Sequence, residues 1–237
     1  MNDKPVEFQK TAIGPVDCLK ASKDVMGDQY WLFLGISFVG MLIASAVPLG
    51  ILMGPMMCGI YLCYFRRMRG ETVEFGTLFK GFDYFVQSLL ATLILVGVMA
   101  VVMLPVYCLL FAGITGMASQ VDRGRGDELA LASMFGMMGV FYLIVLLMSL
   151  AVWVFAAFAY PLIVDRDLKA VPALTTSFRA AWANLGGMLG LVGLLFVISL
   201  AASLCCYVPV FFFMPFAFGT MAVAYRKVFP DQSKPAV

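Results

Sequence analysis

Four long runs without a charged residue alternate with short polar stretches along this chain. The runs cover residues 29–65, 84–121, 129–164 and 180–225. Each run exceeds the roughly 20 apolar residues that one transmembrane helix needs. Membrane-spanning helices are therefore expected in all four.

The first and last runs each contain a signal that ends a helix near their middle. Pro48 and Gly50 interrupt the first run, and residues 205–209 (CCYVP) interrupt the last. Because these residues break a helix, each of the two runs predicts a hairpin of two spans. The two middle runs offer only Pro105 as a turn signal, so we expect one long helix in each, kinked or projecting beyond the bilayer. The pattern predicts an all-α polytopic membrane bundle with six transmembrane helices.

Three shorter stretches carry apolar residues at helical spacing among polar ones. One helix is expected from Gly14, with Pro15 at its first position, a second over residues 75–82, and a third around Val171 and Leu174. They are too short to span a bilayer and predict amphipathic helices in the membrane interface. The aromatic residues expected to anchor the chain there are Trp31, Phe75, Phe79, Phe82, Phe178 and Trp182.

The order of amphipathic segment, span, break, span and basic end recurs along the chain. Leu19 and Ser22 match Leu174 and Ser177 at one offset, and Pro55, Gly59 and Arg66 match Pro215, Gly219 and Arg226 at another. We expect a threefold internal repeat, with units at 14–69, 75–164 and 168–227. A single membrane domain is expected over 14–229, with a flexible N-terminal segment at 1–13 and a cytoplasmic tail at 230–237.

Composition identifies the solvent of this fold as lipid. The chain has 237 residues, of which 62% are hydrophobic and only 13% charged, and its mean hydropathy is +0.96. A soluble domain of average composition is about half apolar and about a quarter charged. Residues 1–28 lack the apolar core of a signal peptide, so the first run is expected to stay in the membrane as an anchor.

The basic residues predict the orientation in the membrane. Of the 16 lysines and arginines, only Arg123 and Arg125 fall in the loop between the two middle runs. All the others lie in segments that six spans would place on one side, which the positive-inside rule makes the cytoplasm. We therefore expect a multi-pass protein of a bacterial or archaeal cytoplasmic membrane with both termini cytoplasmic.

Residues that carry chemistry are scarce in this sequence. Histidine is absent, the cysteines form no CxxC pair, and no charged residue lies within the four runs. Asp165, Arg166 and Asp167 form the most chemical-looking group, but they are typical of a helix end solvated at the interface. No catalytic site, metal site or cofactor is expected, and neither is a nucleic-acid partner.

Small residues on the predicted spans indicate how helices meet. Gly50 and Gly54, and Gly186 and Gly190, have GxxxG spacing, which lets two membrane helices approach closely. These four glycines are the candidate helix-packing face. Six spans must first pack against one another, so packing within the bundle is favoured over homodimerisation.

Several segments resemble a known group of proteins. They are residues 54–71, 75–82, 160–185 and 215–229. Their order resembles a widespread bacterial and archaeal group of six-helix membrane proteins, mostly of unknown function, similar to the membrane-anchor domain of some glycerophosphoryl diester phosphodiesterases. The resemblance implies a six-helix membrane fold and no catalytic residues. This chain departs from the group in an insertion at 113–135, and no appended phosphodiesterase domain or activity is expected.

Two classes of function follow from the sequence. The first is a non-enzymatic scaffold or accessory subunit that packs against partner proteins or lipids, as the missing polar core and the small-residue faces indicate. The second is a transporter or channel for a neutral or amphiphilic small molecule, which the repeat and the prolines favour. Gln87 and Asn184 are the strongly polar residues that such a pathway would use.

Overall fold

The computed structural model of the chain describes residues 6–47, 50–121, 127–204 and 208–230. The described residues form helices and no β-strand. In chain order they are α1 (Pro15–Met26), the 3₁₀ helix η1 (Gly27–Gln29), α2 (Tyr30–Ala46), α3 (Met53–Met68), the 3₁₀ helix η3 (Phe75–Tyr84), α4 (Phe85–Val121), α5 (Asp127–Ala156), α6 (Ala159–Arg166), α7 (Ala170–Ala183), α8 (Leu185–Leu204) and α9 (Val208–Val228). The all-α prediction is confirmed for this part of the chain.

Five of the helical segments are long and apolar enough to cross a membrane. They are Pro15–Ala46, Phe75–Gly116, Ala132–Arg166, Leu185–Leu204 and Val208–Val228. By helix length and hydropathy the chain is a multi-pass membrane protein. The sequence predicts six spans, and the remaining one corresponds to α3. That helix has only 16 residues, or about 24 Å at a rise of 1.5 Å per residue, against about 30 Å of hydrocarbon.

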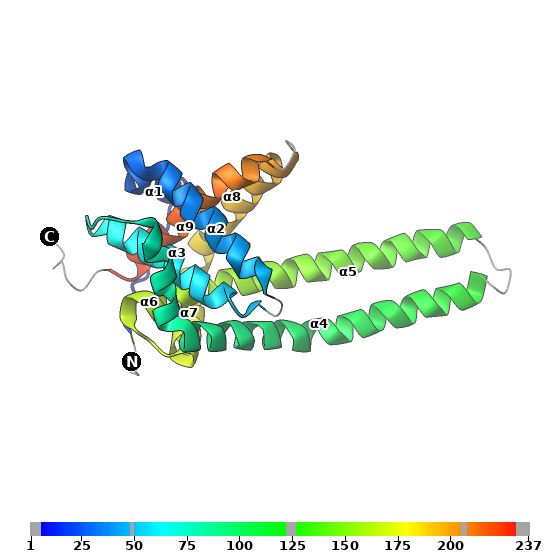
Figure 1. The fold of residues 1–237 in the computed structure, drawn as a ribbon. Helices are drawn as coiled ribbons and strands as arrows, with labels where there is room; N and C mark the ends of the chain where they lie inside the picture. The colour runs from blue at the N-terminus through cyan, green and yellow to red at the C-terminus, as the bar shows by residue number, and fades with distance from the viewer. Residues whose placement is uncertain (1–5, 48–49, 122–126, 205–207, 231–237) are drawn as a thin grey trace. The chain divides into compact units, whose positions relative to one another are not determined.

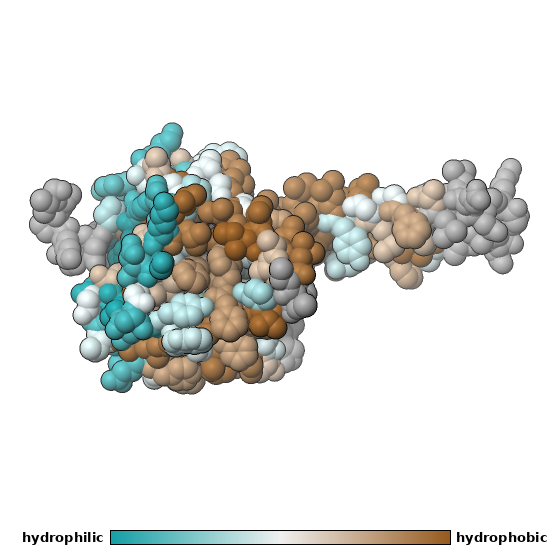
Figure 2. Space-filling model, turned by 90° about the horizontal axis from the view of Figure 1, so that it is seen from above, coloured by the Kyte–Doolittle hydropathy of each residue, from teal (hydrophilic) through white to brown (hydrophobic). Residues whose placement is uncertain are grey.

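The chain divides into two compact units. One contains residues 1–93 and 154–237 and is called the core unit here; the other contains residues 94–153 and is called the hairpin unit. The helical parts of the hairpin unit are residues 94–121 of α4 and 127–153 of α5, which run side by side (Figure 1). In the core unit, hydrophilic residues gather at one end and hydrophobic residues cover much of the rest of the face in view (Figure 2).

Helix α3 lies at the centre of the core unit. Its residues from Gly54 to Tyr61 and from Cys63 to Phe65 are buried, and it packs against α2, η3, α6 and α9. A Cβ atom at Gly59 would clash with the carbonyl oxygen of Leu78 in η3, and one at Gly81 would clash with the carbonyl oxygen of Pro55. Two glycines therefore let α3 and η3 cross with their backbones in contact.

The segment at 75–84 is helical, but its helix type differs from the α-helical stripe that the sequence predicts. With three residues per turn, η3 places Leu78 on one face with buried Gly81 and turns Phe79 and Phe82 to another face. Leu78 is fully buried in the core unit, whereas Phe75, Phe79 and Phe82 are exposed. The Glu74 N–H donates to the Thr77 hydroxyl over 3.4 Å at the start of the helix.

The run at 84–121 forms one helix as predicted, but the run at 129–164 does not. α5 ends at Ala156 and α6 begins at Ala159. Pro161 explains the break, since its ring would clash with the Ala157 carbonyl in a continuous helix, whereas the first turn of α6 needs no proline N–H. Ser177 in α7 bonds to the backbone on both sides of this break. Its hydroxyl donates to the Phe155 carbonyl over 2.7 Å and accepts from the Phe158 N–H over 3.1 Å.

The described part of the N-terminal segment is extended and makes several contacts in the core unit. The Gln9 N–H donates to the Val228 carbonyl over 2.9 Å, the rings of Phe8 and Phe229 meet edge to face, and Ile13 is buried. Residues 1–5 of that segment lie outside the described residues. So do residues 48–49 and 205–207 at the two predicted hairpin turns, residues 122–126 of the polar loop, and tail residues 231–237.

Candidate functional site

The two polar residues that a transport pathway would use are both bonded to nearby backbone. The Gln87 carboxamide oxygen accepts the Ala170 N–H at 3.0 Å, at the start of α7. The Asn184 oxygen accepts the Thr11 N–H at 2.9 Å. The Asn184 amide donates to the Gln9 carbonyl at 3.3 Å and to the Ala180 carbonyl at 2.9 Å. Both side chains thus hold neighbouring segments in place.

A second polar pair lies deeper in the core unit. The Thr92 hydroxyl is 3.0 Å from the Tyr160 hydroxyl and donates to the Ser88 carbonyl over 2.8 Å. Gly54 faces the same backbone, since a Cβ there would meet the Ser88 carbonyl at 2.5 Å. Thr92 therefore bonds back to its own helix while it links α6 to α4 close to the α3 crossing.

A charged cluster joins the ends of α6 and α9. The Asp165 carboxylate accepts two hydrogen bonds from Arg226, at 2.7 and 3.1 Å, and one from the Tyr225 hydroxyl at 2.8 Å. Arg166 pairs with the same carboxylate at 3.2 Å and donates to the Pro230 carbonyl over 2.6 Å. The Asp165 side chain is only 6% exposed. With so many donors already bound, the carboxylate is positioned as a clamp rather than as a free base.

Sequence reasoning placed Asp165 and Arg166 at a solvated helix end. The structure buries them instead, because Arg226 lies against Asp165 and also over the ring of Phe65, 4.6 Å from its centroid. Arg226 is 61 residues away in sequence. The sequence shows that two of the predicted hairpins end on basic residues. No local pattern indicates that Asp165 pairs with one of them.

The four candidate packing glycines have different surroundings. Gly54 contacts the Ser88 backbone, as described above. Gly50 has a φ of +66° at the start of the turn before α3, a conformation that favours glycine. Gly190 faces the Pro15 ring, whose Cγ would lie 3.2 Å from an added Cβ, and a Cβ at Gly186 would meet nothing within 4 Å.

The tightest backbone crossing uses two glycines outside that candidate set. In the sequence, Gly59 belongs to the set of proline, glycine and arginine that recurs at a constant offset. Gly81 carried no signal, since it lies in a short segment with no GxxxG partner. Their juxtaposition depends on the crossing of α3 and η3, which the sequence does not reveal.

The predicted interfacial aromatic residues are exposed and form three clusters. Trp31 is 71% exposed and meets the rings of Tyr30 and Phe212 edge to face. Phe75 and Phe79 form a second edge-to-face pair, next to stacked Phe82 and Phe85. In the third, Phe155, Phe178 and Trp182 stack, with centroids 4.6 to 6.2 Å apart. Such exposed rings suit a membrane interface.

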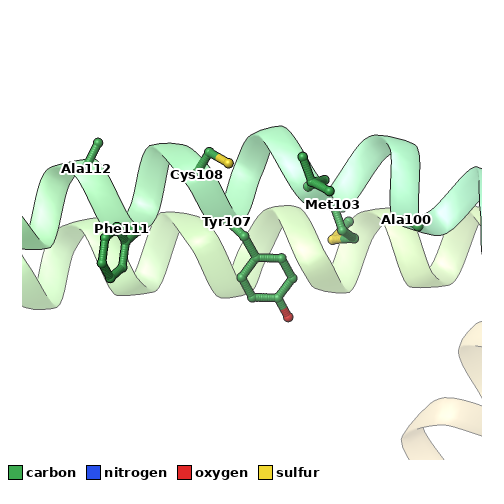
Figure 3. Close-up of a pocket in the computed structure, with 7 residues that line it drawn as sticks. Ala100, Met103, Tyr107, Cys108, Phe111 and Ala112 are labelled. Atoms are coloured by element: carbon green, nitrogen blue, oxygen red, sulfur yellow. The ribbon is translucent and has the colours of Figure 1, made fainter. Parts of the chain in front are cut away.

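Exposed apolar side chains cover much of the hairpin unit. Its exposed side chains include Val101, Leu104, Tyr107, Phe111, Phe135, Val140 and Leu143. Tyr107 contacts Phe141 across the two helices, with centroids 5.1 Å apart. An open apolar groove of about 640 Å³ follows α4 from Ala100 to Ala112, with Tyr107 and Phe111 on the same side (Figure 3).

Several glycines of the hairpin unit face no other part of the protein. A Cβ at Gly97, Gly136 or Gly139 would meet nothing within 4 Å, whereas one at Gly113 would meet the Met137 side chain. Among residues with described placement, no group of three metal-ligating side chains is found. The chemically distinct feature of this unit is therefore an apolar surface with open glycines.

The chain matches no protein family, no curated protein and no solved structure. The resemblance to six-helix prokaryotic membrane proteins therefore stays a prediction. What the structure does show is a helical protein with five candidate membrane spans.

Proposed function

We propose that this chain is a non-enzymatic scaffold or accessory subunit of a bacterial or archaeal cytoplasmic membrane, and that its hairpin unit binds the transmembrane helix of a partner protein. The observation that carries the proposal is the exposed apolar surface of α4 and α5, with open space at Gly97 on α4 and at Gly136 and Gly139 on α5. Close approach at small residues is how membrane helices associate, because lipid already satisfies their apolar side chains.

The length of the hairpin helices supports a protein partner. The part of α4 in the hairpin unit, residues 94–121, is about 42 Å long at 1.5 Å per residue. It contains no charged residue and exceeds the roughly 30 Å of a bilayer's hydrocarbon core. An upright helix of this length leaves apolar surface beyond the lipid, which a partner helix would cover.

The alternative function, a transporter or channel, has less support. Gln87 and Asn184, the residues on which it would depend, are bonded to the backbone of α7 and of the N-terminal segment. Transport sites place polar groups in a cavity near the midplane. The groove along α4 is lined by apolar residues and Tyr107.

Our proposal includes six spans, with α3 as a short one, and a threefold repeat. Each amphipathic segment packs against a helix that precedes a basic end: α1 on α9, η3 on α3, and α7 on α6. The matched serines support this arrangement, since Ser22 donates to the Phe216 carbonyl over 3.5 Å and Ser177 to that of Phe155 over 2.7 Å.

The proposed topology places α1, η3 and α7 on the cytoplasmic side. Exposed Lys80 on η3 provides a test. A cysteine at this position should react with a membrane-impermeant maleimide only after the cells are permeabilised. Labelling of intact cells above the level of the parent protein would contradict the proposed orientation.

Photo-crosslinking tests the partner. A benzoylphenylalanine in place of Leu143, which is 54% exposed on α5, should form one discrete protein adduct in the native membrane. Gly139→Leu should abolish the adduct, because the added side chain keeps a partner helix away. Val140→Leu introduces the same side chain at the next residue, which is also exposed and already large, and it is the matched control. Adducts with lipid alone, or a protein adduct unaffected by Gly139→Leu, would contradict the proposal.

A further inference from the structure

A hollow in the core unit lies between the N-terminal segment and the junction of α7 and α8. Its volume is about 690 Å³, and it is lined by residues 10–13 and 183–187. Asn184 fixes both walls, since it bonds to Gln9 and Thr11 on one side and to Ala180 on the other. Gly187 packs against Ile13, with a Cβ position 2.8 Å from the isoleucine Cβ, whereas Gly186 leaves open space.

The charge around this hollow is positive. Lys10 lines it, and no carboxylate is among the described lining residues. Arg179 lies one turn before Ala183 on the same face of α7, is exposed, and is the only charged residue of that helix. The carboxylates nearest in sequence are those of exposed Glu7, three residues before Lys10, and exposed Asp17, which lies beside Gly14. An anionic group in the hollow would meet Lys10 in the lining, with Arg179 one turn away along α7.

An apolar surface begins where the hollow ends. Trp182, 62% exposed, immediately precedes it, and α8 continues from it with exposed Leu189, Phe196 and Val197. α8 is one of the candidate membrane spans. A polar hollow at the end of an exposed apolar helix, with an indole at the boundary, has the amphipathic form of a phospholipid.

We propose that this hollow binds the headgroup of an anionic phospholipid, with Lys10 and Arg179 facing the headgroup charge and the acyl chains lying along α8. This inference deepens the proposed function by naming a lipid class, and it rests on the membrane placement given there. It is independent of the hairpin unit and of any partner protein.

Fluorescence quenching of Trp182 tests the site in the full-length protein. Trp31→Phe and Trp153→Phe leave Trp182 as the single tryptophan of the three. The protein is reconstituted in vesicles that mix unlabelled phosphatidylcholine with dibrominated phosphatidylglycerol or with dibrominated phosphatidylcholine. The dibrominated phosphatidylglycerol should quench Trp182 more strongly than the dibrominated phosphatidylcholine does. Each cation that contributes should raise the apparent preference for phosphatidylglycerol about fivefold.

Two pairs of variants test which residues cause the preference for phosphatidylglycerol. Lys10→Gln should lower the phosphatidylglycerol preference about fivefold, whereas Lys80→Gln, an exposed lysine on η3, should leave it unchanged. Gly186→Leu should remove the preference by filling the hollow. Gly193→Leu places the same side chain two turns along the same face of α8, where a Cβ also meets nothing within 4 Å, and should have no effect.

Equal quenching by the two brominated lipids would overturn the site, as would equal losses in Lys10→Gln and Lys80→Gln. Soluble glycerol 3-phosphate should not reduce the quenching difference. If it does so at millimolar concentration, the hollow is a site for a soluble phosphate and the lipid assignment is wrong. The photo-crosslinking experiment at Leu143 does not involve this hollow, so a failure of either proposal leaves the other testable.

Discussion

Two glycines of the core unit and three of the hairpin unit have opposite surroundings. At Gly59 and Gly81, an added methyl would clash with a carbonyl oxygen of the neighbouring helix. At Gly97, Gly136 and Gly139, it would meet nothing. At these two positions the core unit brings its own backbone into contact, while no part of the chain fills the three positions in the hairpin unit.

A small residue on a membrane helix permits the close approach of another helix without specifying which helix that is. In the core unit the partner helix belongs to the same chain. In the hairpin unit the two long helices meet through Tyr107 and Phe141, and Gly113 and Met137, which leaves other faces exposed. Substitutions in the core unit test one side of this contrast, from the largest expected effect to the smallest.

Removal of the charge on Asp165 should have the largest effect on stability. Asp165→Asn leaves Arg226, whose side chain is 15% exposed, beside a neutral group in the core unit. Breaking a buried pair in this way costs about 3 kcal/mol. Thermal unfolding of the purified protein in detergent should show the loss. Asp83→Asn, at an exposed position of η3, should leave unfolding unchanged, and an equal effect of both variants would contradict the clamp.

Gly81→Ala should be the next most damaging change. Its methyl would clash with the Pro55 carbonyl, so η3 must shift away from α3, at about 2 kcal/mol. Gly76 is the matched control, because it lies in the same 3₁₀ helix and a Cβ there meets nothing within 4 Å. Gly76→Ala should change the unfolding midpoint little. A similar loss in both variants would show that helix propensity, rather than the crossing, sets the effect.

Ser177→Ala should cost about 1–2 kcal/mol. The substitution leaves the Phe155 carbonyl and the Phe158 N–H without their partner at the break between α5 and α6. Thr175→Ala removes a hydroxyl that bonds only within α7, so it should have a smaller effect. The unfolding midpoints of the two variants give the comparison, and equal losses would mean that Ser177 does not support the break.

Much of the fold could be predicted from the sequence because lipid makes hydropathy a strong signal. The uncharged run at 84–121 predicts α4, and Pro15 predicts the start of α1. Pro161 is a local signal for the break before α6, but its partner Ser177 could not be predicted, because the two meet only in the folded chain. The same holds for Asp165 with Arg226.

The candidate site was less predictable than the fold. GxxxG spacing identified Gly54, which lies at a backbone contact, but it also selected Gly186, which has open space around it. It did not identify Gly81, whose partner is the backbone of a different helix. Spacing within one helix cannot report the angle at which a second helix crosses it.

Our central claim is that the core unit packs on itself and that the hairpin unit binds a partner. The most direct test compares the unfolding free energies of Gly59→Leu and Gly139→Leu in the purified protein. Gly59→Leu should lower the unfolding free energy by about 3 kcal/mol. Gly139→Leu should change it by less than about 0.5 kcal/mol, while it abolishes the protein adduct at Leu143 in the native membrane. Equal destabilisation by the two variants would contradict the account, since it would show that the hairpin glycines are already filled within the chain.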